Sequence, residues 1–234
     1  MRGSPHTVSD VMTHSPVAVG RDASFKDVVA LLDRWKVSAL PVLEGEGRVI
    51  GVVSEADLLP KEEFRDSDPD RFVQRERLAD LAKAGGVTAG ELMSAPAVTV
   101  HADATLAEAA RIMARRRVKR LPVVDGVGLL KGIVSRADLL KVFLREDAEL
   151  TEEVRREVVD RLFPLSADHI QVEVDEGVVT LTGWIDSTDL APVAARLARA
   201  VEGVVGVRCH LAGLRTQRHE LTRRAAALLS PCRR

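Results

Sequence analysis

The order of apolar and polar positions repeats itself over the first 140 residues of the chain. When the sequence is shifted by 81 residues, Val8–Leu59 aligns with Ala89–Leu140 without a gap, and nineteen of the 52 aligned pairs are identical. In each copy a short extended stretch precedes apolar residues at helical spacing, then two apolar runs around a glycine turn, then a second helix. This pattern predicts a pseudo-symmetric pair of β-α-β-β-α repeats, whose sheets need each other to bury both faces.

The hydrophobic period changes after Leu144. Leu150, Val154, Val158 and Leu162 follow at helical spacing, and Pro164 ends that helix. Two alternating strands around the turn at 175–177, a helix capped at position 187 and a last strand complete the segment. We expect a small α-β-β-α-β domain here, so that the fold class of the whole chain is α+β.

These patterns divide the chain into five parts. The first repeat takes residues 1–66, a linker helix 67–86, the second repeat 87–146, the α-β-β-α-β domain 147–213, and a basic tail 214–234. In the linker, Arg71–Lys83 has a helical pattern that stops at Gly85 and Gly86, and its alternating charges predict a solvated face rather than a site. The tail contains six arginines and one acid, and we expect it to be disordered or docked on the preceding acidic domain.

Composition narrows the function classes. The chain is 46% apolar and 29% charged with a net charge of -1, which is typical of a water-soluble globular protein and argues against a coat for nucleic acid or membrane. Aromatic residues make up only 3%, so we expect no base-stacking platform. Cys209 and Cys232 are far apart and in no metal-ligand spacing. With no signal-peptide core and no run of about 18 apolar residues, we expect a cytoplasmic protein.

Several short segments of the two repeats resemble CBS (cystathionine β-synthase) domains. They are Asp10-Val11-Met12-Thr13 and Glu91-Leu92-Met93-Ser94, the two Leu-Pro-Val strands, and the closing pattern Gly-x-Val/Ile-Val-Ser-x-x-Asp-Leu. The resemblance covers about residues 7–145. It implies a Bateman module that forms a homodimer through its CBS pair and binds AMP, ADP, ATP or S-adenosylmethionine between the repeats, with no metal required.

The Ser-x-x-Asp segments are the candidate ligand site. Ser54 and Ser135 are placed to cap short helices, where backbone N–H groups and the helix dipole favour an anion. The resemblance assigns a ribose contact to Asp57 and Asp138 and a phosphate-side contact to the two serines. Spacing alone leaves an ordinary capping box as the alternative, in which each aspartate bonds back to the cap N–H.

The second repeat contains a basic cluster that the first lacks. A polyphosphate needs cations, so we expect the tighter site in this repeat, with Lys119 and Arg120 as candidate binding residues and Arg120 the better placed. Alternatively the cluster is a solvated helix end that complements the helix dipole, or it contacts nucleic acid, and the absence of an aromatic residue among these cations argues against the latter. Its members are Arg111, Arg115, Arg116, Arg117, Lys119 and Arg120.

The last domain is similar to a BON domain. The similarity rests on Gly177–Ile185 and on Val201–Val207, and it covers about residues 149–213. BON domains imply attachment to phospholipid or to another protein. Residues 149–213 carry six Arg or Lys and twelve Asp or Glu, a net charge of 6 − 12 = -6. Anionic lipid repels such a domain, so we expect an unknown protein partner and keep phospholipid as the alternative.

Catalytic constellations are missing from the sequence. The six histidines are scattered, and no nucleophile elbow, P-loop or dinucleotide fingerprint occurs. We therefore predict a non-enzymatic regulatory protein that binds an adenosine nucleotide between its repeats and relays this through dimer packing to the BON domain. The alternative is a constitutive dimeric adaptor, or a phospholipid-associated protein, without a nucleotide response.

Overall fold

A computed structural model describes residues 6–65 and 78–213. The chain divides into two compact units, one of residues 6–139 and one that begins at Leu140, and each is described by itself. The expected tail structure at 214–234 and the first part of the expected linker helix lie outside the described residues. No helix in the described ranges combines the length and the apolar character needed to cross a bilayer.

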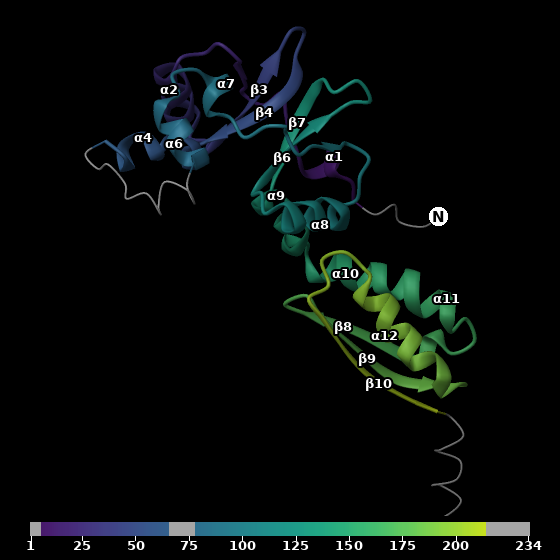
Figure 1. Ribbon diagram of the computed structural model, residues 1–234. Coiled ribbons are helices and arrows are strands. Elements are labelled where there is room, and N and C mark those ends of the chain that lie inside the picture. Colours follow the sequence, from purple (N-terminus) through teal and green to yellow (C-terminus); the bar gives the residue numbers. More distant parts are fainter. Residues whose placement is uncertain (1–5, 66–77, 214–234) are drawn as a thin grey trace, which may run out of the picture. The chain divides into compact units, whose positions relative to one another are not determined.

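The first unit contains the predicted β-α-β-β-α order twice, which confirms the repeat (Figure 1). The strand, helix, hairpin and closing helix of the two copies match one another closely in length. In the first copy they are β2 (Val19–Gly20), α2 (Phe25–Trp35), β3 (Ala39–Glu44), β4 (Arg48–Ser54) and α3 (Glu55–Leu58). In the second they are β5 (Val100–His101), α8 (Leu106–Arg116), β6 (Arg120–Val124), β7 (Leu130–Ser135) and α9 (Arg136–Leu140).

The long helices α2 and α8 begin and end in the same way. Ser24 and Thr105 accept a hydrogen bond from the backbone N–H three residues on, at 3.2 Å in both cases. Lys36 and Arg117 end the helices in the left-handed conformation, with φ of 51° and 55°. The buried face of α2 is narrower than its periodicity suggests, because Val29 is 41% exposed.

The two repeats exchange their N-terminal segments. The first repeat's sheet has the order β2-β3-β4, whereas the second has β1-β7-β6-β5, with β1 (Thr13–His14) coming from the N-terminal part of the first repeat. Similarly α1 (Val8–Val11) bonds to the second repeat through Val8 N–H and Ala104 O, at 2.8 Å. In return α7 (Ala89–Leu92) bonds to the first through Ala89 N–H and Ala23 O, also at 2.8 Å, and Leu92 joins the first repeat's core.

The start of α7 is fixed by Glu91, whose carboxylate accepts the backbone N–H groups of Val87 and Thr88 at 2.8 and 3.0 Å. These hydrogen bonds, with the one from Val87 contributing most, hold the pKa of the Glu91 carboxyl below its usual value. Because α7 is anchored at both its cap and Leu92, Ser94 is held next to Val52 of β4, with which it exchanges backbone hydrogen bonds at 2.8 and 3.1 Å.

Among the described residues that join the cores of the two repeats, two short helices occur, α4 (Pro60–Glu63) and α6 (Leu78–Gly85). The helix α6 ends at Gly85, as its sequence predicts. The Lys61 ammonium donates to the carbonyl oxygen of Ala84 at 2.9 Å and so ties the end of α6 to α4. The linker helix therefore packs on the first repeat within the same unit.

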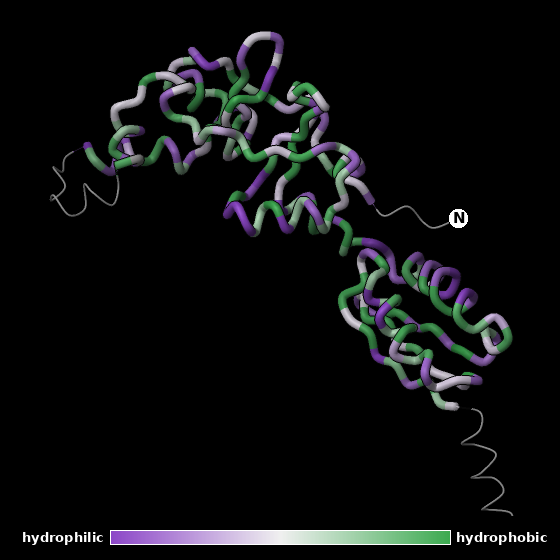
Figure 2. Tube along the Cα trace, turned by 45° about the vertical axis from the view of Figure 1, so that its right-hand side comes forward, coloured by the Kyte–Doolittle hydropathy of each residue, from purple (hydrophilic) through white to green (hydrophobic). Residues whose placement is uncertain are grey.

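The second unit confirms the predicted α-β-β-α-β order. Its three-stranded sheet has the order β10-β9-β8, with β8 and β9 antiparallel and β9 and β10 parallel, and the helices cover one face (Figure 1). Hydrophobic and hydrophilic residues alternate around those helices (Figure 2). The elements are η1 (Lys141–Leu144), α10 (Asp147–Val154), η2 (Arg155–Val159), α11 (Asp160–Leu162), η3 (Ala167–His169), β8 (Ile170–Asp175), β9 (Val178–Ile185), η4 (Thr188–Leu190), α12 (Ala191–Arg199) and β10 (Gly206–Gly213).

Two local features of this unit were not predicted. The π-helical turn η2 inserts a residue into the first helix, so that Val158 and Val159 are both buried. Within β9, Gly183 has a φ of +133°, and a Cβ there would lie 2.0 Å from the carbonyl oxygen of His169. The close approach of β8 to β9 at this point therefore requires a glycine.

Candidate ligand-binding site

The second repeat's Ser-x-x-Asp segment lies where three strands meet. The carboxylate oxygen Oδ2 of Asp138 accepts the backbone N–H and the hydroxyl of Ser135, at 2.9 and 2.6 Å. Antiparallel pairing places Arg120 of β6 opposite Ser135, and Thr13 of the exchanged strand β1 opposite Ile133. The capping box is therefore formed, and it holds the half-buried Asp138 at a fixed position beside residues of both repeats.

A cavity of about 310 Å³ opens beside Asp138. Its volume falls at the lower end of the range of about 300–1,000 Å³ that is usual for small-ligand sites. Residues of both repeats line it, and those of the first repeat come from β1 with the stretch that follows it and from the end of α2 through the start of β3. The lining residues are Thr13, Ser15, Pro16, Val17, Trp35, Val37, Ala39, Arg120, Ile133, Ser135 and Asp138.

Arg120 crosses from the second repeat to the first. Its guanidinium nitrogen Nη2 donates to the hydroxyl of Ser38, and its side chain is half-buried. It lines the cavity beside Asp138 and also a second hollow of about 600 Å³ next to α2 and α3, which Val29 and Leu59 border. A permanent cation thus stands within the reach of a ligand bound beside Asp138.

Trp35 brings an aromatic ring to the cavity beside Asp138. The side chain is 54% exposed, and the Arg34 guanidinium lies 5.9 Å from the ring centroid. The low aromatic content of the chain says nothing about where a single ring lies, and the expectation that it offers no base-stacking platform stays a prediction.

The other predicted cations do not join this cavity. Lys119 is exposed and lines neither of the two hollows, and its backbone oxygen accepts the N–H of Arg136 at 3.1 Å. The remaining arginines of the basic cluster are exposed along and after α8. Two of them, Arg115 and Arg116, occupy the last turn of that helix, where positive charge complements the helix dipole.

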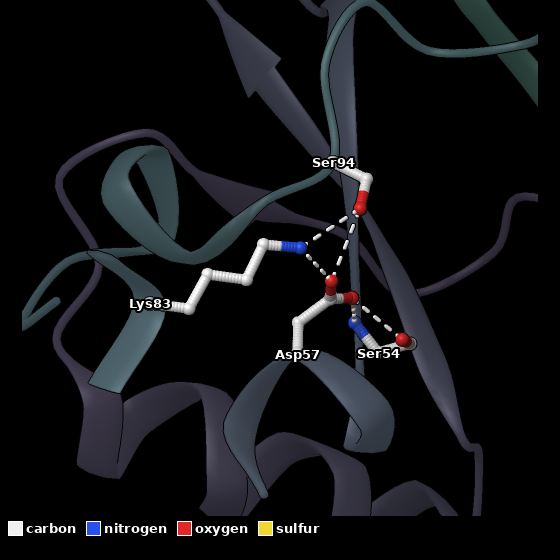
Figure 3. A network of polar contacts seen from close by, with 4 residues as sticks. All are labelled: Ser54, Asp57, Lys83 and Ser94. Carbon is white, nitrogen blue, oxygen red and sulfur yellow. Dashed lines mark hydrogen bonds and ion pairs between the residues drawn. The ribbon is translucent and has the colours of Figure 1, made fainter. Parts of the chain in front are cut away.

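In the first repeat the corresponding carboxylate contacts a lysine (Figure 3). Asp57 uses Oδ2 as Asp138 does, accepting the N–H and hydroxyl of Ser54 at 2.8 and 2.6 Å. Its other oxygen, Oδ1, pairs with the Lys83 ammonium and accepts the Ser94 hydroxyl at 3.0 Å. The interpretation of the linker helix as a purely solvated face is therefore wrong at Lys83, whose side chain is only 19% exposed.

Comparison with known families agrees with this architecture. The CBS domain family matches residues 8–61 and 89–145, and the BON domain family matches residues 146–213. The protein is a tandem CBS-domain protein with a C-terminal BON domain. The CBS pair thus contains both Ser-x-x-Asp segments and the cavity beside Asp138.

Curated relatives resemble the CBS pair. The uncharacterized protein MJ1426 of Methanocaldococcus jannaschii is 28% identical over 160 residues, which is 62% of this chain and 95% of that protein. The chloroplastic CBS domain-containing protein CBSX2 of Arabidopsis thaliana is 31% identical over 153 residues, 60% of this chain and 64% of CBSX2.

A crystal structure of CBSX2 in complex with AMP resembles the fold with a TM-score of 0.53. It is 33% identical in sequence, and the match covers 59% of this chain and 97% of that one. The CBS pair of this protein therefore has the fold of a CBS pair that has been crystallised with an adenosine nucleotide.

Proposed function

We propose that the CBS pair binds an adenosine nucleotide in the cavity beside Asp138 and acts as a non-enzymatic sensor. The observation that carries this proposal is the meeting of Asp138, Ser135, Arg120 and Trp35 around one hollow of about 310 Å³. A carboxylate accepts hydrogen bonds from ribose hydroxyls, a guanidinium binds phosphate, and an aromatic ring can stack on a base. The AMP complex of CBSX2, at 33% identity, supports the ligand class.

Each residue has a distinct part in the proposed site. Asp138 binds the ribose diol, and its Oδ2 stays bonded to the Ser135 cap. Ser135 borders the side of the cavity that receives the phosphate, and Arg120 supplies the positive charge that binds this phosphate. Lys119 is retained as an outer cation that a longer phosphate chain reaches. AMP, ADP, ATP and S-adenosylmethionine are the ligands to compare, and no metal is needed because the cation is provided by arginine.

A titration that uses Trp35 as its reporter tests this function. The chain contains two tryptophans, so Trp184→Phe leaves Trp35 beside the cavity as the single indole. We expect saturable fluorescence changes with at least one of the four ligands. A ligand at a hundred times its dissociation constant should also stabilise the fold by about 2.7 kcal/mol. No fluorescence change and no thermal shift with any of them would favour the constitutive adaptor instead.

Asp138→Ala is expected to weaken nucleotide binding about 100-fold, or about 2.7 kcal/mol, because the ribose hydroxyls lose a charged acceptor. Isothermal titration calorimetry measures this loss. Asp103→Ala is the matched control, since it removes an exposed acid of the same repeat. Circular dichroism checks that both variants fold. Equal affinities in the two variants would remove Asp138 from the site.

Arg120→Ala should reduce ATP affinity about 10- to 100-fold and leave adenosine affinity within about threefold, because only ATP presents phosphate to the guanidinium. Ser38→Ala is the matched control. It removes the hydroxyl that Arg120 binds across the repeats and keeps the cation. Competition with a fluorescent adenosine analogue measures all the affinities. A similar loss for adenosine and ATP would show that Arg120 acts by shaping the cavity rather than by binding phosphate.

We further propose that two copies pair through their CBS units and that ligand binding alters this packing, to which a BON-bound partner responds. Val29 and Leu59, 41% and 64% exposed beside the hollow of about 600 Å³, provide apolar surface for the pairing. For the BON domain, the net charge of 6 − 12 = -6 over residues 149–213 favours a protein partner over anionic phospholipid.

A further inference from the structure

The first repeat's Asp57 has four hydrogen-bond donors around its two carboxylate oxygens. Ser54 supplies two of them to Oδ2, while the Lys83 ammonium and the Ser94 hydroxyl supply two to Oδ1. An ionised carboxylate has about four acceptor positions. The acceptor capacity of Asp57 is therefore used by the protein's own groups, and the residue is 8% exposed.

The donors on Oδ1 come from outside the first repeat. Lys83 belongs to the linker helix α6, and Ser94 follows α7 in the segment that the second repeat contributes. They are joined to each other as well, because the ammonium donates to the Ser94 hydroxyl at 3.0 Å. Figure 3 shows the lysine side chain reaching from its helix to the space in front of the carboxylate.

The chemistry of this contact matches that of the proposed ligand. A ribose diol offers an aspartate two hydroxyl donors, and the ammonium and serine hydroxyl offer the same kind of donor to the same oxygen. The ion pair is also largely shielded from water, since the side chains of Lys83 and Asp57 are 19% and 10% exposed. A charge pair that is shielded in this way is weakly screened by salt and is not displaced cheaply.

We propose that Lys83 is a built-in occupant of the first-repeat site, so that the CBS pair accepts one adenosine nucleotide per chain, beside Asp138. This inference rests on the proposed function of the Asp138 cavity. Lys83 thereby determines how many nucleotides each chain binds. It also gives the two Ser-x-x-Asp segments different roles. The second segment senses ligand, and the first fastens the linker helix to the repeat that precedes it.

Calorimetric stoichiometry with AMP tests the proposal on the full chain. We expect one AMP per wild-type chain and two per Lys83→Ala chain, with the added site lost again in Lys83→Ala/Asp57→Asn. Lys61→Ala is the matched control, because Lys61 ties the same helix through Ala84 but makes no contact with Asp57. It should keep one site. Two sites in Lys61→Ala would show that loosening α6, rather than freeing Asp57, opens the repeat, and would overturn the proposal.

Other outcomes separate this inference from the proposed function. Two AMP molecules per wild-type chain, or one in both wild type and Lys83→Ala, would overturn the inference and leave the function standing. A third outcome is that wild type binds no AMP, whereas Lys83→Ala binds one AMP at a site that the added Asp57→Asn substitution abolishes. This outcome would contradict the proposed binding beside Asp138 and support Lys83 as the occupant of the first-repeat site. No binding by either chain would overturn both.

Photolabelling of the wild-type chain with 8-azidoadenosine monophosphate covers the case in which Lys83→Ala fails to fold. We expect labelled peptides from the stretch Thr13–Val17, which lines the Asp138 cavity, and none from the stretch around Ser94. Labelling around Ser94 that excess AMP suppresses would overturn the proposal.

Discussion

Asp57→Ala is expected to lower the free energy of unfolding of the CBS pair by about 3 kcal/mol. The substitution leaves the Lys83 ammonium, 19% exposed, without the carboxylate that compensates its charge. Breaking a buried ion pair from one side typically costs about 3–5 kcal/mol, and the partial exposure of Lys83 places the effect near the lower end. Urea unfolding followed by Trp35 fluorescence, in the Trp184→Phe background, reports on this unit alone.

Two further variants separate charge from helix capping. Asp27→Ala removes an equivalent capping carboxylate from the exposed start of α2, and should cost only about 1 kcal/mol. The double variant Asp57→Ala/Lys83→Met removes both charges, and should recover at least half of the loss because no ion remains buried. If the double variant is as unstable as Asp57→Ala, the unpaired Lys83 ammonium is not the cause of the lost stability.

Gly183→Ala is expected to destabilise the BON domain by about 3 kcal/mol or more. A φ of +133° is strained for any residue with a side chain, and the new Cβ would lie 2.0 Å from the carbonyl oxygen of His169. That oxygen belongs to the backbone entering β8, so relief requires the two strands to separate. Trp184 is the adjacent residue in β9, and its fluorescence in the Trp35→Phe background follows the unfolding of this domain.

Gly206→Ala is the matched control in the same sheet. A Cβ at Gly206 would have the methyl groups of Val178 as its nearest neighbours, at 3.8 Å, which is ordinary van der Waals contact. We expect a change within about 1 kcal/mol. Similar losses from both substitutions would mean that the sheet tolerates no added methyl group, and the special conformation of Gly183 would not be the reason.

The fold followed from the sequence because its signals are local and are repeated. The 81-residue offset superimposes caps, glycine turns and apolar runs, and each copy folded as the pattern predicts. Alternation around the turn at Gly177 likewise predicted the strands of the BON domain. The π-helical turn at Arg155–Val159 was missed because valines at neighbouring positions fit an ordinary helix equally well.

The contacts of the candidate site were harder to predict because they join distant parts of the chain. Lys83 lies 26 positions from Asp57, in a helix whose alternating charges are typical of a solvated face. The contact of Arg120 with Ser38 spans 82 positions, and the place of Arg120 before the Leu-Pro-Val strand indicated only that its side chain can reach past the start of that strand. No local pattern marks Trp35 as a cavity residue, since its ring stands at a helix end.

The exchanged segments also affect how the protein is made. The core of the first repeat includes Ala89 and Leu92, which are synthesised after the linker helix and at the beginning of the second repeat. A ribosome that has released only residues 1–66 has therefore exposed a sheet and helix whose core is incomplete. The first repeat can complete its core during translation only after α7 has left the exit tunnel. The helices α4 and α6 therefore emerge from the ribosome before the core of the first repeat is complete.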